Sequence, residues 1–342
     1  MNQVKAVEKE NVVMQAAGCT VTILPRLGGK IASILIKDRG IGGPGIGDKE
    51  LLQSPLTAYA PRTRAMSFDA GDASGWDECL PSVAACAVET ACGTAAVPDH
   101  GDLWRVEWSE NGEQEPGTRD GGLGTASRRG AAVTLRGECF SLPLALERTI
   151  DLAETEKGWR LRLDYTVRKL GGTAVPWSWA AHPLFVAEAG DRIVLPPSIE
   201  TLRVEGSGGD RLGRNGDTVS WPMAMLADGS ESDLSKVQAS DSGIGDKVFA
   251  GPLAAGENWC ALERPRAGVR IKVGFDAAAT PYLGLWLCYG GWPERLGTKQ
   301  MCVALEPCTA PVDSLAETGP WTRMLAGGES FSWPMTVEIE SI

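Results

Sequence analysis

Histidine is scarce in this sequence: its 342 residues include only two, His100 and His182. Histidine is the one side chain whose ordinary pKa, about 6.5, lies near neutrality, so acid–base chemistry in this chain would involve these two positions. A histidine in a loop is more often a structural hydrogen-bonding group than a catalyst, and neither position is evidence by itself. With two imidazoles and no C-x-x-C pair among the nine cysteines, we expect no metal site.

The sequence also lacks the signals of several protein classes. No apolar run approaches the roughly 18 residues that a membrane-spanning helix needs, and the first ten residues contain no apolar segment typical of a signal peptide. The cysteines are odd in number and several stand in strand-like runs, which is typical of reduced thiols. We therefore expect a soluble cytoplasmic protein without a membrane partner.

The chain has fewer basic than acidic residues, with 33 lysine and arginine residues against 44 aspartate and glutamate residues, so its net charge is −11. The resulting field repels nucleic acid and anionic membrane surfaces. We therefore expect no nucleic-acid partner. A neutral small molecule suits this chain better, and the sequence gives no signal of an oligomeric state.

Nucleotide and hydrolase motifs find no support. Residues 40–45 match the G-x-G-x-x-G pattern, but Pro55 interrupts the helix that a dinucleotide site requires next. We expect a surface loop at this place. No phosphate-binding loop, H-E-x-x-H string or G-x-S-x-G string occurs.

Alternation of apolar and polar residues is the dominant local pattern. It runs through residues 160–167 and 269–275, and again through 19–24, 104–108 and 335–342. This period of two is typical of half-buried strands in antiparallel sheets. No comparable stretch carries a sustained 3.6-residue apolar stripe, so we expect little helix.

Glycine and proline, 42 and 21 residues, are spread along the chain in short clusters that fit frequent turns between strands. Strand-like segments of the same character resume on both sides of each cluster, so none of them reads as an interdomain linker. We predict an all-β fold, a large antiparallel sandwich of two packed sheets, formed by residues 1–342 as a single domain.

Tryptophan is unusually frequent, with 12 residues against six phenylalanines and four tyrosines. An indole can stack on the C–H surface of a sugar while its ring N–H donates to a hydroxyl. Core packing is the more common role of a single tryptophan. Trp76 and Trp292 stand beside glycine and proline in turn-like strings, where both roles fit equally well.

Four short strings stand in a fixed order along the chain: Gly75-Trp-Asp-Glu-Cys-Leu-Pro81, Pro98-Asp-His-Gly-Asp-Leu-Trp104, Trp179-Ala-Ala-His-Pro-Leu-Phe185 and Leu305-Glu-Pro307. Each is weakly specific alone. In this order and with this wide spacing they resemble the aldose 1-epimerases (galactose mutarotases) and their relatives, over about residues 28–342.

The resemblance implies a β-supersandwich whose concave sheet holds a monosaccharide, with no metal or organic cofactor. It makes His182 the general acid that protonates the ring oxygen and Glu306 the general base that takes the proton of the anomeric hydroxyl. It makes His100 a sugar-binding residue, and Asp246, in an Asp-x-x-Phe string, a residue that grips ring hydroxyls. We expect a neighbouring carboxylate to keep His182 protonated.

Further sugar contacts are expected where the chain departs from the family pattern. The family's Asn-Arg string is replaced by Pro61-Arg-Thr-Arg-Ala65, which leaves Arg62 and Arg64 as alternatives, and we take Arg64 as the candidate. We also expect at least one residue of the following string, Trp76, Asp77 or Glu78, at the rim of the pocket. The alternative for Trp76 is that it closes one end of the sandwich.

The leading hypothesis is therefore an aldose 1-epimerase that interconverts the α and β anomers of a hexose by acid–base ring opening. A non-catalytic carbohydrate-binding protein on the same fold is the alternative from another class. A sugar-phosphate epimerase is a third possibility, disfavoured by the acidic charge and by the absence of an arginine cluster near the motifs.

Overall fold

The computed structural model describes residues 11–37, 47–110, 126–129, 132–294 and 296–342. Strands dominate these residues, and helix occurs among them only as short 3-10 turns, so the predicted all-β class is confirmed. The expected loop at residues 40–45 lies outside the described residues. The 3-10 turns are η2 (Pro25–Leu27), η3 (Phe68–Ala70), η4 (Leu103–Arg105), η5 (Gly208–Asp210), η6 (Ser240–Ser242) and η7 (Pro265–Ala267).

The larger of two main sheets has twelve strands, which pair in antiparallel fashion except where β1 meets β9. Its order from edge to edge is β17 (Thr218–Ser220), β16 (Thr201–Ser207), β20 (Ile244–Ala250), β23 (Tyr282–Tyr289), β24 (Met301–Cys308), β14 (Ala180–Val186), β5 (Trp76–Cys79), β3 (Lys30–Ile36), β2 (Cys19–Leu24), β1 (Val12–Ala16) and β9 (Ala126–Arg129), with β4 (Lys49–Glu50) paired to β3.

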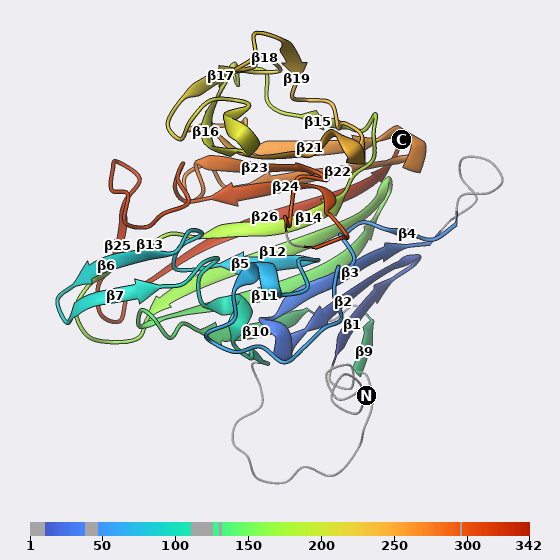
Figure 1. Cartoon of the computed structure of the whole chain (residues 1–342). Helices are drawn as coiled ribbons and strands as arrows, with labels where there is room; N and C mark the ends of the chain where they lie inside the picture. The colour runs from blue at the N-terminus through green and yellow to red at the C-terminus, as the bar shows by residue number, and fades with distance from the viewer. Residues whose placement is uncertain (1–10, 38–46, 111–125, 130–131, 295) are drawn as a thin grey trace.

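The smaller main sheet has eight antiparallel strands, and three two-stranded ribbons complete the fold (Figure 1). The eight strands run in the order β15 (Arg192–Val194), β21 (Trp259–Arg264), β22 (Val269–Phe275), β26 (Ser330–Ser341), β12 (Gly158–Lys169), β11 (Leu144–Thr155), β10 (Val133–Glu138) and β8 (Ser109–Glu110). The ribbons are β6 (Cys86–Thr90) with β7 (Gly93–Val97), β13 (Val175–Trp177) with β25 (Arg323–Leu325), and β18 (Met223–Met225) with β19 (Glu231–Asp233).

One hydrophobic core fills the space between the two main sheets. The larger sheet contributes residues such as Ile34 and Leu285, and the smaller sheet contributes residues such as Leu163 and Val337, all of them fully buried. Because successive side chains of a strand point to opposite faces, the intervening residues of the larger sheet point away from this core. The sandwich predicted from the sequence is thus present.

The face of the larger sheet that points away from the core, here called the outer face, is also largely covered. Two small apolar clusters lie on it, one around Ala180, Phe249 and Cys308 and one around Leu184 and Ala304. A sheet buried on both faces reads as a nearly continuous apolar run, as β23 and β24 do. The polar residues set into these runs are therefore the unusual ones.

One expected strand is absent. Residues 104–108 alternate in hydrophobicity, yet they continue from the 3-10 turn η4 into irregular chain. The indole of Trp104 donates to the carbonyl of Asp99 and that of Trp108 to the carbonyl of Leu103, five residues back in each case. These local bonds, together with burial of both rings, replace the strand pairing that the alternation predicted.

Candidate functional site

His182 and Glu306 project from neighbouring strands of the larger sheet onto its outer face. On β14 the flanking Ala181 belongs to the core between the sheets, and on β24 the flanking Leu305 does the same, so both polar side chains point the other way. The His182 Nε2 atom lies 3.9 Å from Oε1 of Glu306. This oxygen is buried and has no hydrogen-bond partner among the described residues.

His100 reaches the same place from a tight turn. Its φ of 57° and the φ of 68° at Gly101 are left-handed, and a Cβ at Gly101 would lie 2.3 Å from the carbonyl oxygen of Leu80, so glycine is required there. The His100 ring stacks on Phe68, with a centroid distance of 3.7 Å, and meets His182 edge-on at 5.2 Å. The two histidines of the chain are thus neighbours.

Two charged residues that the sequence analysis did not select, Lys247 and Asp313, complete the cluster. The Lys247 ammonium forms an ion pair with Oε2 of Glu306 and lies 3.7 Å from Oδ1 of Asp313. Lys247 comes from β20, and Asp313 from the chain that follows β24. One cation therefore lies between two carboxylates.

A cavity of about 400 Å³ opens over this cluster. Glu306 lies behind its wall, where it contacts His182 and Lys247. The lining includes the charged or polar residues His100, His182, Lys247, Asp313 and Gln300 and the aromatic residues Phe68, Trp286 and Trp292. The size and the mixture of aromatic and polar groups suit a small polar ligand.

Burial and neighbouring charge set the protonation of the cluster. Burial lowers the pKa of His182 well below its usual range, and the neighbouring His100 and Lys247 side chains lower it further. His182 is thus uncharged at neutral pH, and the expectation that a carboxylate would keep it protonated is wrong.

The carboxyl group of Asp313 shows the opposite tendency. Burial and the neighbouring charge of Glu306 together raise its pKa to about 6, although the Lys247 ammonium opposes the rise. The pKa of Lys247 itself is raised, because Asp313 and Glu306 outweigh the effect of burial. Lys247 therefore remains an ammonium ion, while Asp313 exchanges its proton near neutral pH.

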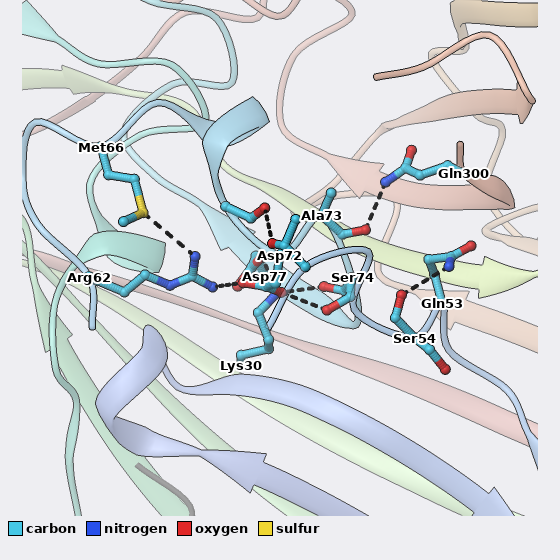
Figure 2. Close-up of polar contacts among 12 residues, drawn as sticks. Lys30, Gln53, Ser54, Arg62, Met66, Asp72, Ala73, Ser74, Asp77 and Gln300 are labelled. Atoms are coloured by element: carbon cyan, nitrogen blue, oxygen red, sulfur yellow. Dashed lines mark hydrogen bonds and ion pairs between the residues drawn. The ribbon is translucent and has the colours of Figure 1, made fainter. Parts of the chain in front are cut away.

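A buried network of charges supports the cavity from the side of β3 and β5. The Lys30 ammonium contacts Asp72 and Asp77, and Arg62 closes the group through Asp72 (Figure 2). The Lys30 and Arg62 cations lower the pKa of Asp72 to about 2 despite its burial. Two cations thus balance two carboxylates beside the site.

Gln300 connects this network to the cavity wall. Its amide nitrogen donates to the carbonyl of Ala73, as Figure 2 shows, and its amide oxygen accepts from the indole N–H of Trp286. Ala73 lies between Asp72 and Ser74, whose carbonyl accepts from Lys30. Through Gln300, the charged network thereby holds Trp286 in its place in the cavity wall.

Asp246 does not face the cavity, contrary to expectation. It shares the face of β20 with Val248, which belongs to the core, and its carboxylate accepts hydrogen bonds from Ser207 and Arg211. The next residue, Lys247, takes the outer face instead. The sequence analysis selected the right string but the wrong residue in it, because neighbouring residues of a strand point to opposite faces of the sheet.

The Trp76, Asp77 and Glu78 string contributes none of the residues that line the cavity, so its expected place at the rim is wrong. Trp76 is fully buried in the main core. Glu78 points between the sheets, where it accepts hydrogen bonds from Arg148, Tyr165 and Trp179. Asp77 alone shares the face of His182, its cross-strand partner, and it is engaged by Lys30.

The two arginine alternatives lie outside the cavity lining as well. Arg64 stacks over the ring of Phe140, and Arg62 contacts Asp72 and the ring of Trp104. Trp292, by contrast, lines the cavity and packs near Phe68, with ring centroids 6.2 Å apart. No group of three or more metal-ligating side chains lies together in the described part of the chain.

The missed residues carried only weak sequence signals. Lys247 stands inside the selected string that begins at Asp246. The apolar Val248 beside it indicates that Val248 faces the core and that Lys247 faces the opposite side of the sheet. Asp313 lies in an irregular segment after β24, where no periodicity gives an orientation. Phe68 and Gln300 belong to no recognised string and come to the site only through tertiary packing.

The fold has well-matched counterparts among solved structures. A protein from Synechocystis sp. PCC 6803 superposes with a TM-score of 0.65 and 16% identity, covering 97% of this chain and 96% of that chain. A galactose mutarotase-like protein from Lactobacillus casei gives 0.63 and 16%, covering 96% and 100%. An aldose epimerase homologue from C. elegans gives 0.60 and 10%, covering 97% and 98%.

Sequence comparison adds no closer relative, since no family model and no curated protein matches the chain. No helix in the described ranges is long and apolar enough to cross a membrane. At identities of 10–16%, the structural likeness concerns the backbone arrangement alone. The chain has the fold of the galactose mutarotase-like proteins.

Proposed function

We propose that this chain is an aldose 1-epimerase that interconverts the anomers of a neutral monosaccharide. The observation that carries the proposal is the pairing of His182 with Glu306, whose nearest side-chain atoms are 3.9 Å apart at the wall of a cavity of about 400 Å³. The fold of the galactose mutarotase-like proteins supports the same reading but does not by itself establish a function.

Ring opening requires a proton to leave the anomeric oxygen O1 and another to reach the ring oxygen O5. His182 is uncharged before the sugar binds, so its imidazole is suited to accept the O1 proton. The carboxylate of Glu306 behind it stabilises the imidazolium that results or takes the proton itself, and His182 returns a proton to O5 as the C1–O5 bond breaks. The open aldehyde then turns about its C1–C2 bond and closes again.

The cavity favours a neutral sugar over a sugar phosphate. The lysine in its wall, Lys247, is already engaged by Glu306 and Asp313, and the other carboxylates that line it are Asp69 and Asp99. A phosphate group would meet net negative charge there. Trp292 and Trp286 offer aromatic faces on which the C–H surface of a sugar can stack.

Polarimetry of freshly dissolved α-D-glucose and α-D-galactose tests the proposal. The protein should accelerate mutarotation, and Glu306→Gln or His182→Asn should lower kcat/KM by about two to four orders of magnitude. Both substitutions retain hydrogen-bonding capacity, so sugar affinity measured by calorimetry should change much less. Full activity in either variant would contradict the role assigned to that residue.

The same measurements distinguish the alternative function. If the unaltered protein binds these sugars by calorimetry but never accelerates mutarotation, the proposal is wrong and the chain is a carbohydrate-binding protein. If it accelerates mutarotation of glucose 6-phosphate while glucose and galactose are unaffected, the assignment to neutral sugars is wrong.

A further inference from the structure

The ammonium group of Lys247 keeps hydrogen-bond donors that the surrounding protein does not use. An ammonium has three N–H groups. One of them donates to Oε2 of Glu306, whereas Oδ1 of Asp313, at 3.7 Å, is too distant for a hydrogen bond. No other hydrogen bond of this ammonium occurs in the part of the chain that the structure describes. Because Lys247 lines the cavity, a free N–H is available to a ligand.

Asp313 offers the complementary acceptor beside this donor. Its Oδ1 atom is buried and has no hydrogen-bond partner among the described residues. Because this oxygen and Nζ of Lys247 are 3.7 Å apart, one hydroxyl oxygen can lie about 2.8–2.9 Å from both atoms. Such a hydroxyl accepts from Lys247 and donates to Asp313. A methylene group can do neither, so the pair is suited to recognise a hydroxyl group.

The backbone holds Asp313 in place although this residue lies outside the strands. Its carbonyl accepts hydrogen bonds from the amides of Val83 and Ala84, both of which line the cavity. Its own amide donates to the carboxylate of Glu205 at 3.2 Å. A polar pair that is fixed before the ligand arrives loses little freedom on binding. Lys247 and Asp313 are therefore suited to select among ligands.

The order of the strands places this pair on one side of the proposed proton-transfer centre. On the outer face, His182 projects from β14, Glu306 from β24 and Lys247 from β20, and these strands follow one another in the sheet with β23 between the last two. On β23, Gly284 lies opposite Glu306 and leaves the space open. Glu306 presents Oε1 to His182 and Oε2 to Lys247. The carboxylate therefore lies between the imidazole and the ammonium.

The connectivity of an aldose then indicates which hydroxyl meets Lys247 and Asp313. Both oxygens that exchange protons, O1 and O5, are bonded to C1, and the third heavy atom bonded to C1 is C2. With O1 and O5 beside His182 and Glu306, C2 and its hydroxyl point away from His182. This direction leads past Glu306 to Lys247 and Asp313.

We infer that Lys247 and Asp313 together bind the hydroxyl group at C2 of the sugar and make the site specific for aldoses that carry it. The inference rests on the proposed mutarotase function and names its substrate class. The role of both residues is to bind the substrate, and the proton transfers stay with His182 and Glu306. A 2-deoxy sugar leaves the ammonium N–H and the buried carboxylate oxygen without partners, which a site built to bind a hydroxyl tolerates poorly.

A comparison of substrates tests this inference. Polarimetry gives kcat/KM for D-glucose, 2-deoxy-D-glucose and 6-deoxy-D-glucose, which lacks a hydroxyl on the other side of O5. The unaltered protein should prefer glucose over 2-deoxyglucose by about 10- to 100-fold, as expected for a hydrogen bond to a charged group. Lys247→Met should reduce this preference to about twofold or less. Its disturbance of Glu306 affects both sugars alike, so the ratio isolates the contact at C2.

A second variant and a control keep the test decisive. Asp313→Ala removes the acceptor but leaves Lys247 paired with Glu306, so it should reduce the same preference even if Lys247→Met does not fold. Lys236→Met serves as the control, because Lys236 pairs with Asp233 at the exposed surface, and it should leave the preference unchanged. The ratio of glucose to 6-deoxyglucose should be the same in all of these proteins.

The outcomes separate this inference from the proposed function. If the unaltered protein accelerates mutarotation of glucose and 2-deoxyglucose equally, the inference is overturned and the proposed function stands. The same holds if a folded Lys247→Met or Asp313→Ala variant keeps the full preference. If the unaltered protein accelerates mutarotation of no sugar, the proposed function fails and the inference with it.

Discussion

Individual charged residues on the outer face of the larger sheet are held in groups whose charges compensate one another. Lys30 is fully buried and touches Asp72 and Asp77, and Lys247 lies between Glu306 and Asp313. A buried charge is costly without a partner, and removing one member of a buried pair leaves the other uncompensated. The group around Lys30 and the group around Lys247 should therefore differ in function, but a substitution in either should lower the stability of the protein strongly.

Lys30→Met tests this at the network beside the cavity. The substitution leaves the carboxylates of Asp72 and Asp77 with Arg62 as their remaining cation, and we expect the free energy of unfolding to fall by about 3–5 kcal/mol. Urea titration measures the change. Lys236→Met is the matched control, because its pairing with Asp233 is exposed and should contribute less than about 1 kcal/mol.

Equal stability of Lys30→Met and Lys236→Met would show that the buried network contributes nothing beyond a surface ion pair. Replacing both Lys30 and Asp77 by apolar residues should recover part of the loss, since an apolar pair can substitute for a buried ion pair.

From residue types and short strings, the sequence analysis predicted part of the candidate site. His100, His182 and Trp292 line the cavity and Glu306 lies behind its wall. Asp246 was misplaced because the string gives residue types but not the face of the strand. The protonation of His182 was also misjudged, since it depends on burial and on the neighbouring His100 and Lys247, which only the fold establishes.

At the scale of a strand, Gly284 provides the space in which the central ion pair sits. It lies on β23 opposite Glu306 on one side and Phe249 on the other. A Cβ at this position would lie 3.3 Å from both Oε2 of Glu306 and Nζ of Lys247 and 3.1 Å from the ring of Phe249. A methyl group there must push the ion pair aside.

Gly284→Ala should therefore reduce activity more than stability. We expect kcat/KM for mutarotation to fall by about tenfold or more, because small displacements of reacting groups are costly, and the free energy of unfolding to fall by about 1–3 kcal/mol. Polarimetry and urea titration measure the two effects. In the control Gly206→Ala, on β16 of the same sheet, the added Cβ meets no atom within 4 Å. Unchanged activity in Gly284→Ala would mean that the pair tolerates displacement.

Alternation predicted many strands because burial on one face imposes it. Residues 160–167 lie in β12 and residues 269–275 form β22, both with their apolar residues toward the core. The same signal failed at Trp104 and Trp108, where local hydrogen bonds to backbone carbonyls compete with strand pairing. The alternation does not predict which distant strands pair with each other, such as β14 with β5.

At the scale of the molecule, a shared hydrophobic core and buried polar contacts join the two sheets. The core includes side chains from both. Arg148 and Tyr165 of the smaller sheet hydrogen-bond Glu78 of the larger. We propose on this basis that the chain is a single domain and unfolds as one cooperative unit.

Urea unfolding should then give coincident transitions by far-UV circular dichroism, which follows the sheets, and by small-angle X-ray scattering, which follows the radius of gyration. The physical reason is that neither sheet keeps its buried face without the other. Two separated transitions would refute the single-domain proposal.

Two groups of aromatic residues differ in their access to water. Trp286 and Trp292 line the cavity, whereas Trp179 and Trp333 pack with Tyr165 in a buried cluster between the sheets. A ligand that enters the cavity displaces water from the first pair and leaves the second untouched. The fluorescence of Trp286 and Trp292 should therefore change on ligand binding while that of the buried cluster stays constant, and the difference spectrum reports occupancy without an added dye.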